Sequence, residues 1–420
     1  MTDPSPASTL SASRHPWLVL FALATGAFAI GTTEFAAMSL VPFFSRDLHI
    51  TEPQAGHAIS AYALGVVIGA PLIAVLAARI NRRSLLLGLM ALFALGNGLS
   101  AVAADYHSLL AFRFLSGVPH GAYFGIAALV AASLVPADKR TLSVALVMTG
   151  LTLATVIGVP LANWLGQDLG WRSGFAVVAG LALITVALVA LYAPSQPPAE
   201  NASPMRELGA LRREQVVLTL LTGAIGFGGL FCVYTYAASA MLEVTGLSPG
   251  TVPLMLGLFG IGMTAGNLFW AWLADRHQSR AVVLAMIELA LALALYPFAI
   301  GHGWSLGIVV VLIGFGSGFG TILQSRLMDV AGDAQALAAA AHHSAFNAAN
   351  ALGPWLGGMA LAAGYGYGAT GWIGVGLSLA GLGLFLLAEK HRRDPRGGQE
   401  KSPHFNANDP IPAQTGDRAR

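Results

Sequence analysis

Long apolar segments follow one another along nearly the whole of this 420-residue chain. A helix needs about 20 consecutive apolar residues to cross the roughly 30 Å hydrocarbon core of a bilayer. Segments of that length begin at Trp17 and continue almost to the C-terminus, and only 10% of all residues are charged. A soluble chain of this length would be expected to form two or three domains. The apolar segments instead predict an all-α membrane protein.

The polar turns between these segments predict twelve spans in two groups of six. They are residues 18–41, 55–78, 84–104, 108–132, 142–166 and 172–193, then 215–240, 251–274, 280–301, 304–328, 338–363 and 368–388. The first span is too long for a signal peptide, so we expect it to be retained. We predict a disordered N-terminus (1–16), an N-terminal half (17–193), a Pro-rich linker (194–214), a C-terminal half (215–388) and a solvated tail (389–420).

The two halves repeat each other at a shift of 197 residues. Three motifs return in this single register: Thr25-Gly26-Ala27 as Thr222-Gly223-Ala224, Leu76-Ala77-x-Arg79-x-x-x-Arg83 as Leu273-Ala274-x-Arg276-x-x-x-Arg280, and Gly117-x-x-x-Gly121 as Gly314-x-x-x-Gly318. Duplication of a hydrophobic unit is typical of secondary transporters. The repeat therefore makes transport the leading hypothesis.

The basic residues of the loops lie almost entirely on one side of the predicted spans. Only Arg46 and Arg172 fall in loops on the other side. Since Lys and Arg are enriched in cytoplasmic loops, we predict that both termini are cytoplasmic. The expected location is the plasma membrane, which is the inner membrane of a bacterium.

Several classes of protein are disfavoured by what the sequence lacks. A net charge of +2 gives no reason to expect a nucleic-acid partner, and the lone Cys232 cannot form an internal disulfide. No Gly-Lys-Ser/Thr phosphate-binding loop is present, which argues against an ATP-driven pump. No His-Glu-x-x-His motif is present, so we expect neither an enzyme, a metal site nor a cofactor.

Charged side chains inside the spans demand a reason, because each costs at least about 2.5–3.5 kcal/mol on insertion scales. Glu34 lies roughly 10 Å and Arg113 roughly 8 Å below the outer surface, at 1.5 Å per helical residue. The matching depths predict that the two can pair. They would form either a structural ion pair or a proton or substrate-cation site.

His120 and Glu288 are two further ionisable groups within the spans. His120 is two helical turns after Arg113 on the same face, and it can act as a neutral hydrogen-bonding group, a substrate contact or a proton carrier. Glu288 has no evident partner in the sequence, so we expect a packing contact or a protonated carboxyl.

A polar face in one span and an aromatic face in another are candidate walls of a cavity. His343, Asn347 and Asn350 recur at i, i+4 and i+7. Phe227, Phe231 and Tyr234 recur in the same way, although an aromatic face more often reflects ordinary packing. The further candidates for lining the cavity are Tyr123, Asn163 and Gln324.

Three segments resemble motifs of the major facilitator superfamily, within its twelve-span drug:proton antiporters of the arabinose-efflux-like and chloramphenicol-resistance-like kind. They are Gly31-Thr32-Thr33-Glu34-Phe35 with Pro42, Arg113-Phe114-Leu115-Ser116-Gly117-Val118-Pro119-His120-Gly121-Ala122, and Gly353-Pro354-Trp355-Leu356-Gly357-Gly358. The chain departs from the family pattern at Ala78, where an Asp is usual, and in the loosened antiporter motif Gly158-Val159-Pro160-Leu161-Ala162-Asn163.

The resemblance implies two six-helix halves that rock around a central site, with Glu34, Arg113 and His120 in proton coupling. It also implies a cytoplasmic gate made by Arg79, Arg83, Asp275, Arg276 and Arg280. The expected function is proton-coupled export of a small amphipathic solute or drug by a monomer in the lipid bilayer. Efflux of a sugar or nucleoside, and a transporter-like sensor without net flux, remain alternatives.

Overall fold

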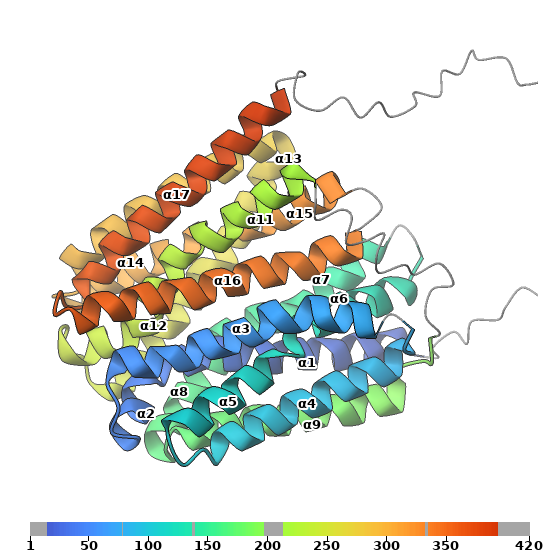
Figure 1. Cartoon of the computed structure of the whole chain (residues 1–420), viewed down its shortest axis with the longest axis horizontal. Coiled ribbons are helices and arrows are strands. Elements are labelled where there is room, and N and C mark those ends of the chain that lie inside the picture. Colours follow the sequence, from blue (N-terminus) through green and yellow to red (C-terminus); the bar gives the residue numbers. More distant parts are fainter. Residues whose placement is uncertain (1–14, 78, 137–138, 197–212, 332–334, 394–420) are drawn as a thin grey trace, which may run out of the picture.

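A computed structural model describes residues 15–77, 79–136, 139–196, 213–331 and 335–393. Most of the predicted N-terminal segment, of the linker and of the tail lies outside these ranges. The described residues form helices and connecting turns, with no strand among them. Figure 1 shows two bodies of helices, an N-terminal half below and a C-terminal half above.

The N-terminal half contains α1 (Pro16–Ser39), α2 (Val41–Asp47), α3 (Glu52–Leu76), α4 (Arg82–Ala101), α5 (Tyr106–Gly117), α6 (His120–Ser133), α7 (Arg140–Leu153), the π-helix η2 (Ala154–Gly158), α8 (Val159–Asp168) and α9 (Arg172–Tyr192). The C-terminal half contains α11 (Glu214–Gly226), α12 (Gly228–Glu243), η3 (Pro249–Thr251), α13 (Val252–Ala299), α14 (Gly303–Gly316), α15 (Phe319–Ala331), α16 (Gln335–Ala362) and α17 (Gly368–Arg393).

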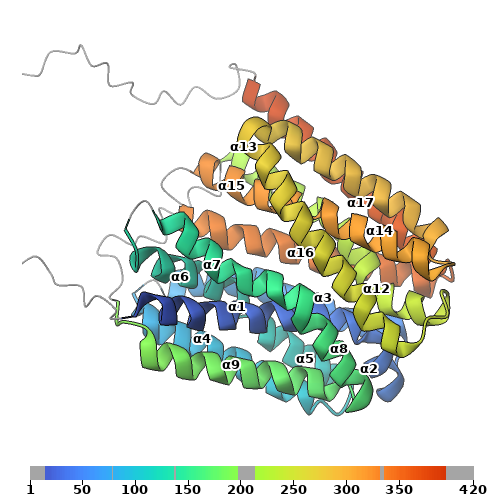
Figure 2. The same ribbon diagram turned by 180° about the vertical axis from the view of Figure 1, so that it is seen from behind.

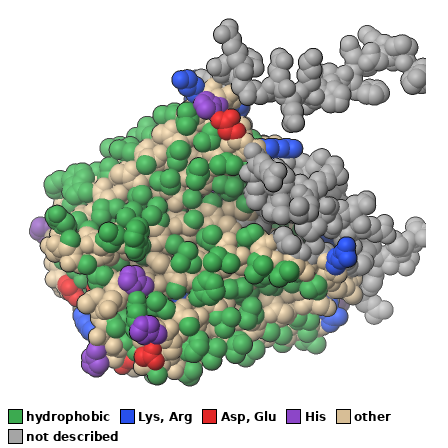
Figure 3. Space-filling model, in the orientation of Figure 1, with side chains coloured by type: hydrophobic (Ala, Val, Ile, Leu, Met, Phe, Trp, Pro, Cys, Tyr) green, Lys and Arg blue, Asp and Glu red, His purple; other side chains and the backbone are tan. Residues whose placement is uncertain are grey.

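Within the described ranges, ten helical segments are long and apolar enough to cross a membrane. One of them, Pro249–Ala299, bends at His277, whose φ of −148° and ψ of 70° are not helical. The 28-residue helix α16 is not among the ten, so the count of twelve spans stays a prediction. Hydrophobic side chains cover most of the face in Figure 3, and charged ones gather towards its two edges, as a bilayer requires.

Four of the predicted spans are broken near their middle. Residues 108–132 form α5 and α6, with Val118 and Pro119 between them, and residues 215–240 form α11 and α12, which meet at Phe227. Residues 304–328 form α14 and α15, and α7 passes into α8 through η2. Broken helices and π-bulges are tolerated at membrane depth where they line a cavity or a protein interior.

Two glycines of the repeat make the same close contact in each half. A Cβ on Gly117 of α5 would lie 2.0 Å from the Tyr62 carbonyl oxygen of α3. A Cβ on Gly314 of α14 would lie 2.3 Å from the Phe259 carbonyl oxygen of α13. Both pairs are related by the 197-residue shift, so the repeat preserves one helix crossing in which only glycine fits.

We expect Gly117→Ala to destabilise the N-terminal half by about 1–3 kcal/mol, because an added methyl group must push two backbones apart. Gly88→Ala in α4 is the matched control, since a Cβ there meets nothing within 4 Å. Thermal unfolding of the purified proteins in detergent should show a lower midpoint for Gly117→Ala alone. Equal midpoints for the two variants would contradict the proposed crossing.

The two halves meet along several pairs of helices. Helix α3 packs along α16, α1 packs against α12, and η2 and α8 pack against α13 (Figures 1 and 2). We call the side where α1 begins and α17 ends the termini side, and the opposite side the far side. A site between the halves is therefore bounded by elements of both.

Candidate functional site

A cavity of about 180 Å³ lies between the two halves. Its walls come from α1, α6 and α7 of one half and from α12, α13, α15 and α16 of the other. They consist of Glu34, Phe35, His120, Met148, Leu151, Thr152, Phe227, Leu230, Phe259, Met263, Asn267, Ser317, Gly320, Thr321, Gln324, His342, His343 and Phe346. Four of these residues (His120, Phe227, Ser317 and Gly320) lie at or beside the helix breaks. The breaks therefore open the interior where the halves face each other.

Among the described residues that line the cavity, Glu34 is the one with an acidic side chain. Its side chain is almost wholly buried, with 2% of the residue exposed. Asn350 Nδ2 of the opposite half donates to Glu34 Oε1 at 3.5 Å, whereas Asn347 Nδ2 donates to the His343 carbonyl oxygen at 3.0 Å. The carboxyl of one half is thus held by an amide of the other.

Arg113 is also buried, but it does not form the predicted ion pair with Glu34. No Arg nitrogen lies within 4.0 Å of the Glu34 carboxyl among the described ion pairs. Arg113 Nη1 instead donates to Thr33 Oγ1 at 3.1 Å, and the guanidinium lies 4.4 Å from the centre of the Tyr62 ring. The cation therefore lies against a hydroxyl and an aromatic face, and it acts on Glu34 only through charge at longer range.

His120 of α6 and His343 of α16 face each other where the two halves meet. His120 Nδ1 lies 2.9 Å from Tyr62 Oη, so the two share a hydrogen bond within the N-terminal half. The His343 ring stacks on Phe124, with ring centres 4.6 Å apart and planes 6° apart. The centres of the two His rings are 5.9 Å apart. Both imidazoles therefore lie at the boundary between the halves.

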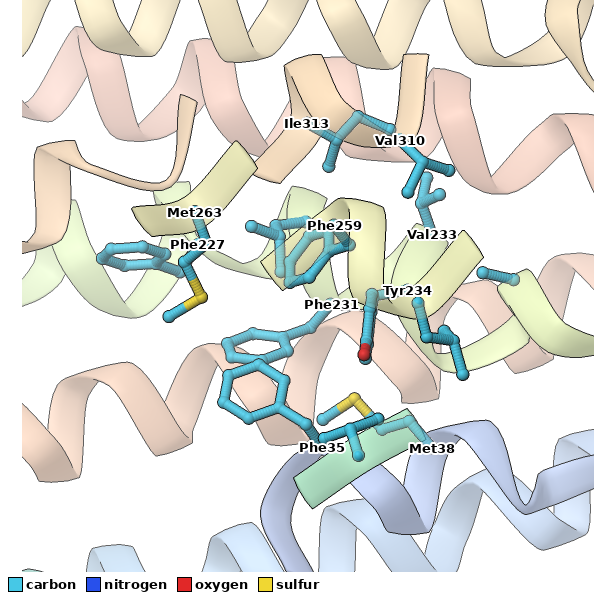
Figure 4. Packing of buried hydrophobic residues seen from close by; sticks show 14 of the residues in the cluster. Phe35, Met38, Phe227, Phe231, Val233, Tyr234, Phe259, Met263, Val310 and Ile313 are labelled. Atoms are coloured by element: carbon cyan, nitrogen blue, oxygen red, sulfur yellow. The ribbon is translucent and has the colours of Figure 1, made fainter. Parts of the chain in front are cut away.

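Aromatic side chains close the cavity on its far side. Phe35 of α1 has its ring centre 5.8 Å from Tyr234 and 6.2 Å from Phe231, both on α12. Tyr234 lies in turn 4.3 Å from Phe259 of α13. Figure 4 shows Phe35 and Met38 of the N-terminal half facing this group. Phe231 and Tyr234, which the sequence predicted for the cavity wall, therefore form its far-side closure, and Phe227 lines the cavity itself.

Polar contacts between the halves continue beyond this closure. Tyr367, in the turn between α16 and α17, has its Oη 2.8 Å from Glu52 Oε2 of α3 and 3.0 Å from Glu243 Oε2 of α12. Ser60 Oγ donates to the Ala351 carbonyl oxygen at 2.9 Å. Among the residues that the structure describes, the hydrogen bonds and ion pairs between halves lie at mid-height or on the far side. The halves are therefore joined there.

Asn347 and Asn350, predicted for the cavity, are not among the residues that line it, and two further predicted residues lie elsewhere. Asn163 donates to the Ser39 carbonyl oxygen at 3.0 Å and accepts from Gln167, which fixes α8 against α1. Tyr123 Oη donates to the Leu23 carbonyl oxygen at 2.8 Å between α6 and α1. Both polar groups are satisfied by the packing of the N-terminal half and do not reach the cavity. His343 and Gln324 do line it.

The residues predicted for a cytoplasmic gate make contacts within their own halves. Arg83 Nη2 donates to the Ala190 carbonyl oxygen at 2.5 Å, and Arg276 lies 4.3 Å from the ring centre of Trp272. Arg79 and Asp275 are exposed. Arg280 lines a groove between α13 and α17. No contact between the halves is described for these five residues, so the gate stays a prediction.

The sequence did not identify several residues that the structure makes prominent. Asn267 and Thr321 line the cavity and hydrogen-bond to each other at 3.0 Å. Phe124 stacks on His343, and Tyr367 bridges two carboxylates. Two of these residues could have been noticed in the sequence: Asn267 is a polar residue inside a predicted span, and Tyr367 lies in a short turn. Within the described ranges, no three His, Cys, Asp or Glu residues gather in a way that could hold a metal ion.

Glu288 of α13 lies outside the cavity. A Cβ on Gly316 of α14 would lie 2.4 Å from its Oε2, which places the carboxyl at the crossing of these two helices. That oxygen is buried and has no hydrogen-bond partner among the residues that the structure describes. The position agrees with the packing contact expected from the sequence.

Comparison with known proteins gives concordant matches over most of the chain. A sequence model of the Major Facilitator Superfamily matches residues 23–240 and 228–415. The inner membrane transport protein YdhP of Escherichia coli (strain K12) is 40% identical over 384 residues, which cover 90% of this chain and 96% of YdhP. A chloramphenicol resistance protein of Streptomyces lividans is 36% identical over 272 residues, covering 64% of this chain and 69% of that protein.

Among solved structures, the nucleoside transporter NupG has a similar fold. The TM-score is 0.69 at 12% sequence identity, and the match covers 88% of this chain and 99% of NupG. At this identity the likeness shows the fold alone. It confirms the prediction of an all-helical fold built from two halves.

Proposed function

The chain belongs to the Major Facilitator Superfamily, and on that premise we propose that it exports a small amphipathic solute or drug in exchange for protons. It is a membrane-spanning transporter rather than an enzyme. The proposed location is the bacterial inner membrane, as the name of the relative YdhP suggests, with both termini in the cytoplasm. The observation that carries the proposal is the buried carboxyl of Glu34 on the cavity wall.

Glu34 has the surroundings of a group that exchanges a proton. Burying an ionised carboxylate without a paired cation costs several kcal/mol, and in the described part of the chain no Lys or Arg forms an ion pair with Glu34. While Glu34 is packed against Asn350, its carboxyl is therefore more stable protonated than ionised. A conformation that separates the halves would withdraw Asn350 and admit water, and it would allow the proton to leave. Proton occupancy is thus linked to the arrangement of the halves.

The contacts between halves support alternating access with the far side closed. The aromatic cluster around Phe35 and the bridge at Tyr367 join the halves on that side. The predicted cytoplasmic gate residues lie on the termini side and make no described contact across the halves. With the termini in the cytoplasm, this is the inward-facing arrangement, in which a substrate reaches the cavity from inside the cell.

The cavity wall favours solutes that are largely apolar and carry a few polar groups. Eight of its residues are Phe, Met or Leu, at positions 35, 148, 151, 227, 230, 259, 263 and 346, and no Lys or Arg is among the lining residues. An anionic solute would find no cation there and would face Glu34. The chloramphenicol resistance relative supports a drug-like solute. Efflux of a sugar or nucleoside remains the second candidate, because Asn267, Thr321 and Gln324 offer hydrogen bonds.

The proposal is tested by expressing the chain in cells that lack other efflux pumps and screening toxic amphipathic compounds for resistance. A compound to which it confers resistance is then added to proteoliposomes that contain a pH-sensitive dye. Substrate transport should be accompanied by proton movement in the opposite direction. Transport without proton movement would contradict antiport, and proton-independent binding without flux would favour a sensor.

We expect Tyr367→Phe to shift the transporter towards the arrangement that is open on the far side. Burial, followed by the Glu52 and Glu243 carboxyls, raises the pKa of Tyr367, so its hydroxyl keeps its proton and remains a donor. Without that donor, two carboxylates of opposite halves face each other unbridged. The test uses a Thr152→Cys/Cys232→Ala background, in which position 152 on the cavity wall carries the reactive thiol. With a membrane-impermeant maleimide added from outside, this thiol should react faster in the Tyr367→Phe variant than in the parent protein.

The matched control for this variant is Tyr365→Phe. Tyr365 lies in the same turn with 76% of its surface exposed, and no contact between its hydroxyl and either carboxyl is described. Its labelling rate should equal that of the parent protein. Equal rates for Tyr367→Phe and the parent would show that the bridge does not hold the far side closed.

A further inference from the structure

A second hollow lies in the C-terminal half, away from the transport cavity. It is a groove of about 530 Å³ between the later part of α13 and the end of α17, on the termini side. Its walls are Ser279, Arg280, Val283, Leu284, Phe385, Leu386, Glu389 and Lys390. None of these residues lines the transport cavity, so the groove needs its own explanation.

The groove has a basic end and an apolar end. Arg280 and Lys390 lie at the ends of the two helices, next to the expected cytoplasmic surface of the membrane. Leu284 lies one turn deeper than Arg280, and Leu386 lies one turn deeper than Lys390. These leucines are 49% and 50% exposed, so the surface between the helices continues as an apolar strip at membrane depth. The order of basic then apolar residues matches the headgroup and chains of a phospholipid.

The charge of the groove is positive. Its single carboxylate, Glu389, pairs with Arg326 and with Arg392, and Ser279 Oγ donates to it at 3.0 Å. Arg280 and Lys390 form no ion pair with a carboxylate in the part of the chain that the structure describes. Both cations thus remain available to an anion, while the groove's own negative charge is already neutralised.

The bend in α13 adds to this attraction. Because His277 is not helical, the second part of α13 begins there, and Ser279 and Arg280 lie in its first turn. Backbone N–H groups at the start of a helix carry a partial positive charge and favour anions. A phosphate at this position would meet the helix start and both basic side chains.

We propose that this groove binds an anionic phospholipid of the inner leaflet, with the phosphate between Arg280 and Lys390 and an acyl chain along Leu284 and Leu386. A membrane lipid fits better than free phosphate, because free phosphate would leave the exposed leucine strip without a partner. Clusters of basic residues at the cytoplasmic ends of spans attract anionic lipids, with each Lys or Arg near the surface contributing about fivefold in affinity. The proposal does not depend on what the transporter exports.

The test measures lipid binding to the full-length protein in detergent by native mass spectrometry. Phosphatidylglycerol should bind in preference to phosphatidylcholine. The double variant Arg280→Gln/Lys390→Gln should bind phosphatidylglycerol about 25-fold more weakly, since two contacts of about fivefold each are removed. Arg79→Gln/Lys139→Gln is the matched control for lipid binding: it makes the same change of charge at two exposed residues of the termini side outside the groove.

Two further measurements separate the sources of the anion. Leu284→Gln/Leu386→Gln should weaken phosphatidylglycerol binding, and inorganic phosphate should not displace the lipid. Equal loss in the two basic double variants would overturn the assignment to this groove. Displacement by inorganic phosphate at equal concentration, or equal binding of phosphatidylcholine, would overturn the assignment to an anionic lipid.

Discussion

Replacing Glu34 by Gln is expected to abolish proton movement coupled to transport while leaving the protein folded. Gln has the shape of Glu and keeps an acceptor for Asn350, but it cannot release a proton. In proteoliposomes, substrate-driven proton release should fall to the level of protein-free vesicles. A pH gradient should no longer drive accumulation of the substrate. Exchange of substrate for substrate, which needs no net proton movement, should persist.

Glu288→Gln is the matched control for this experiment. It makes the same chemical change at another carboxyl inside a span, one that lies at the crossing of α13 and α14 and not on the cavity wall. Proton coupling in this variant should match the parent protein. Normal coupling in Glu34→Gln would reduce Glu34 to a packing residue. Loss of both coupling and exchange would instead point to a direct role in substrate binding.

The parts of the fold that the sequence predicted are those set by local properties. Span length follows from apolar segments, and the glycines at 117 and 314 are related by the repeat because one helix crossing is built twice. The polar face of α16 was visible from its spacing alone. The sequence did not predict that this face contacts Glu34, because the contact depends on how the two halves are placed relative to each other.

Arg113 shows why depth in the membrane does not determine pairing. Its height and that of Glu34 are similar, but height along a helix says nothing about rotation around its axis. Thr33, the neighbour of Glu34, points towards α4 and α5, where its Oγ1 donates to Asn97 Oδ1 at 2.7 Å and accepts from Arg113. Glu34 itself points to the cavity. Thr33 and Glu34 are thus adjacent on α1 but contact different groups.

The predicted end of the last span also differs from the structure. Hydropathy placed that end at residue 388 and assigned Glu389 to a solvated tail, but α17 continues to Arg393 and Glu389 is buried. The helix continues because Arg326 of α15 meets the Glu389 carboxyl. The signal was present as an Arg inside the predicted span 304–328. A hydropathy average hides it, because one charge weighs little against its apolar neighbours.

This buried pair supports the second large effect, on stability. The side chains of Arg326 and Glu389 are only 3% and 8% exposed, and the guanidinium also lies 4.8 Å from the ring centre of Phe385. Removing one member of a buried ion pair leaves an uncompensated charge and costs about 3–5 kcal/mol. We therefore expect Arg326→Met to lower the free energy of unfolding by about that amount. Arg392, which still pairs with Glu389, would place the loss near the lower figure.

The double variant Arg326→Met/Glu389→Leu separates the burial of charge from the loss of a contact. Replacing both members of a buried pair with apolar residues is often neutral or stabilising. Unfolding in mixed micelles of dodecylmaltoside and SDS should therefore show the double variant to be more stable than Arg326→Met alone. If the double variant loses as much free energy of unfolding as the two single variants together, each side chain acts independently. Restored stability would instead show that α15 and α17 are held by the pairing of these two charges, and that the end of α17 is part of the folded C-terminal half.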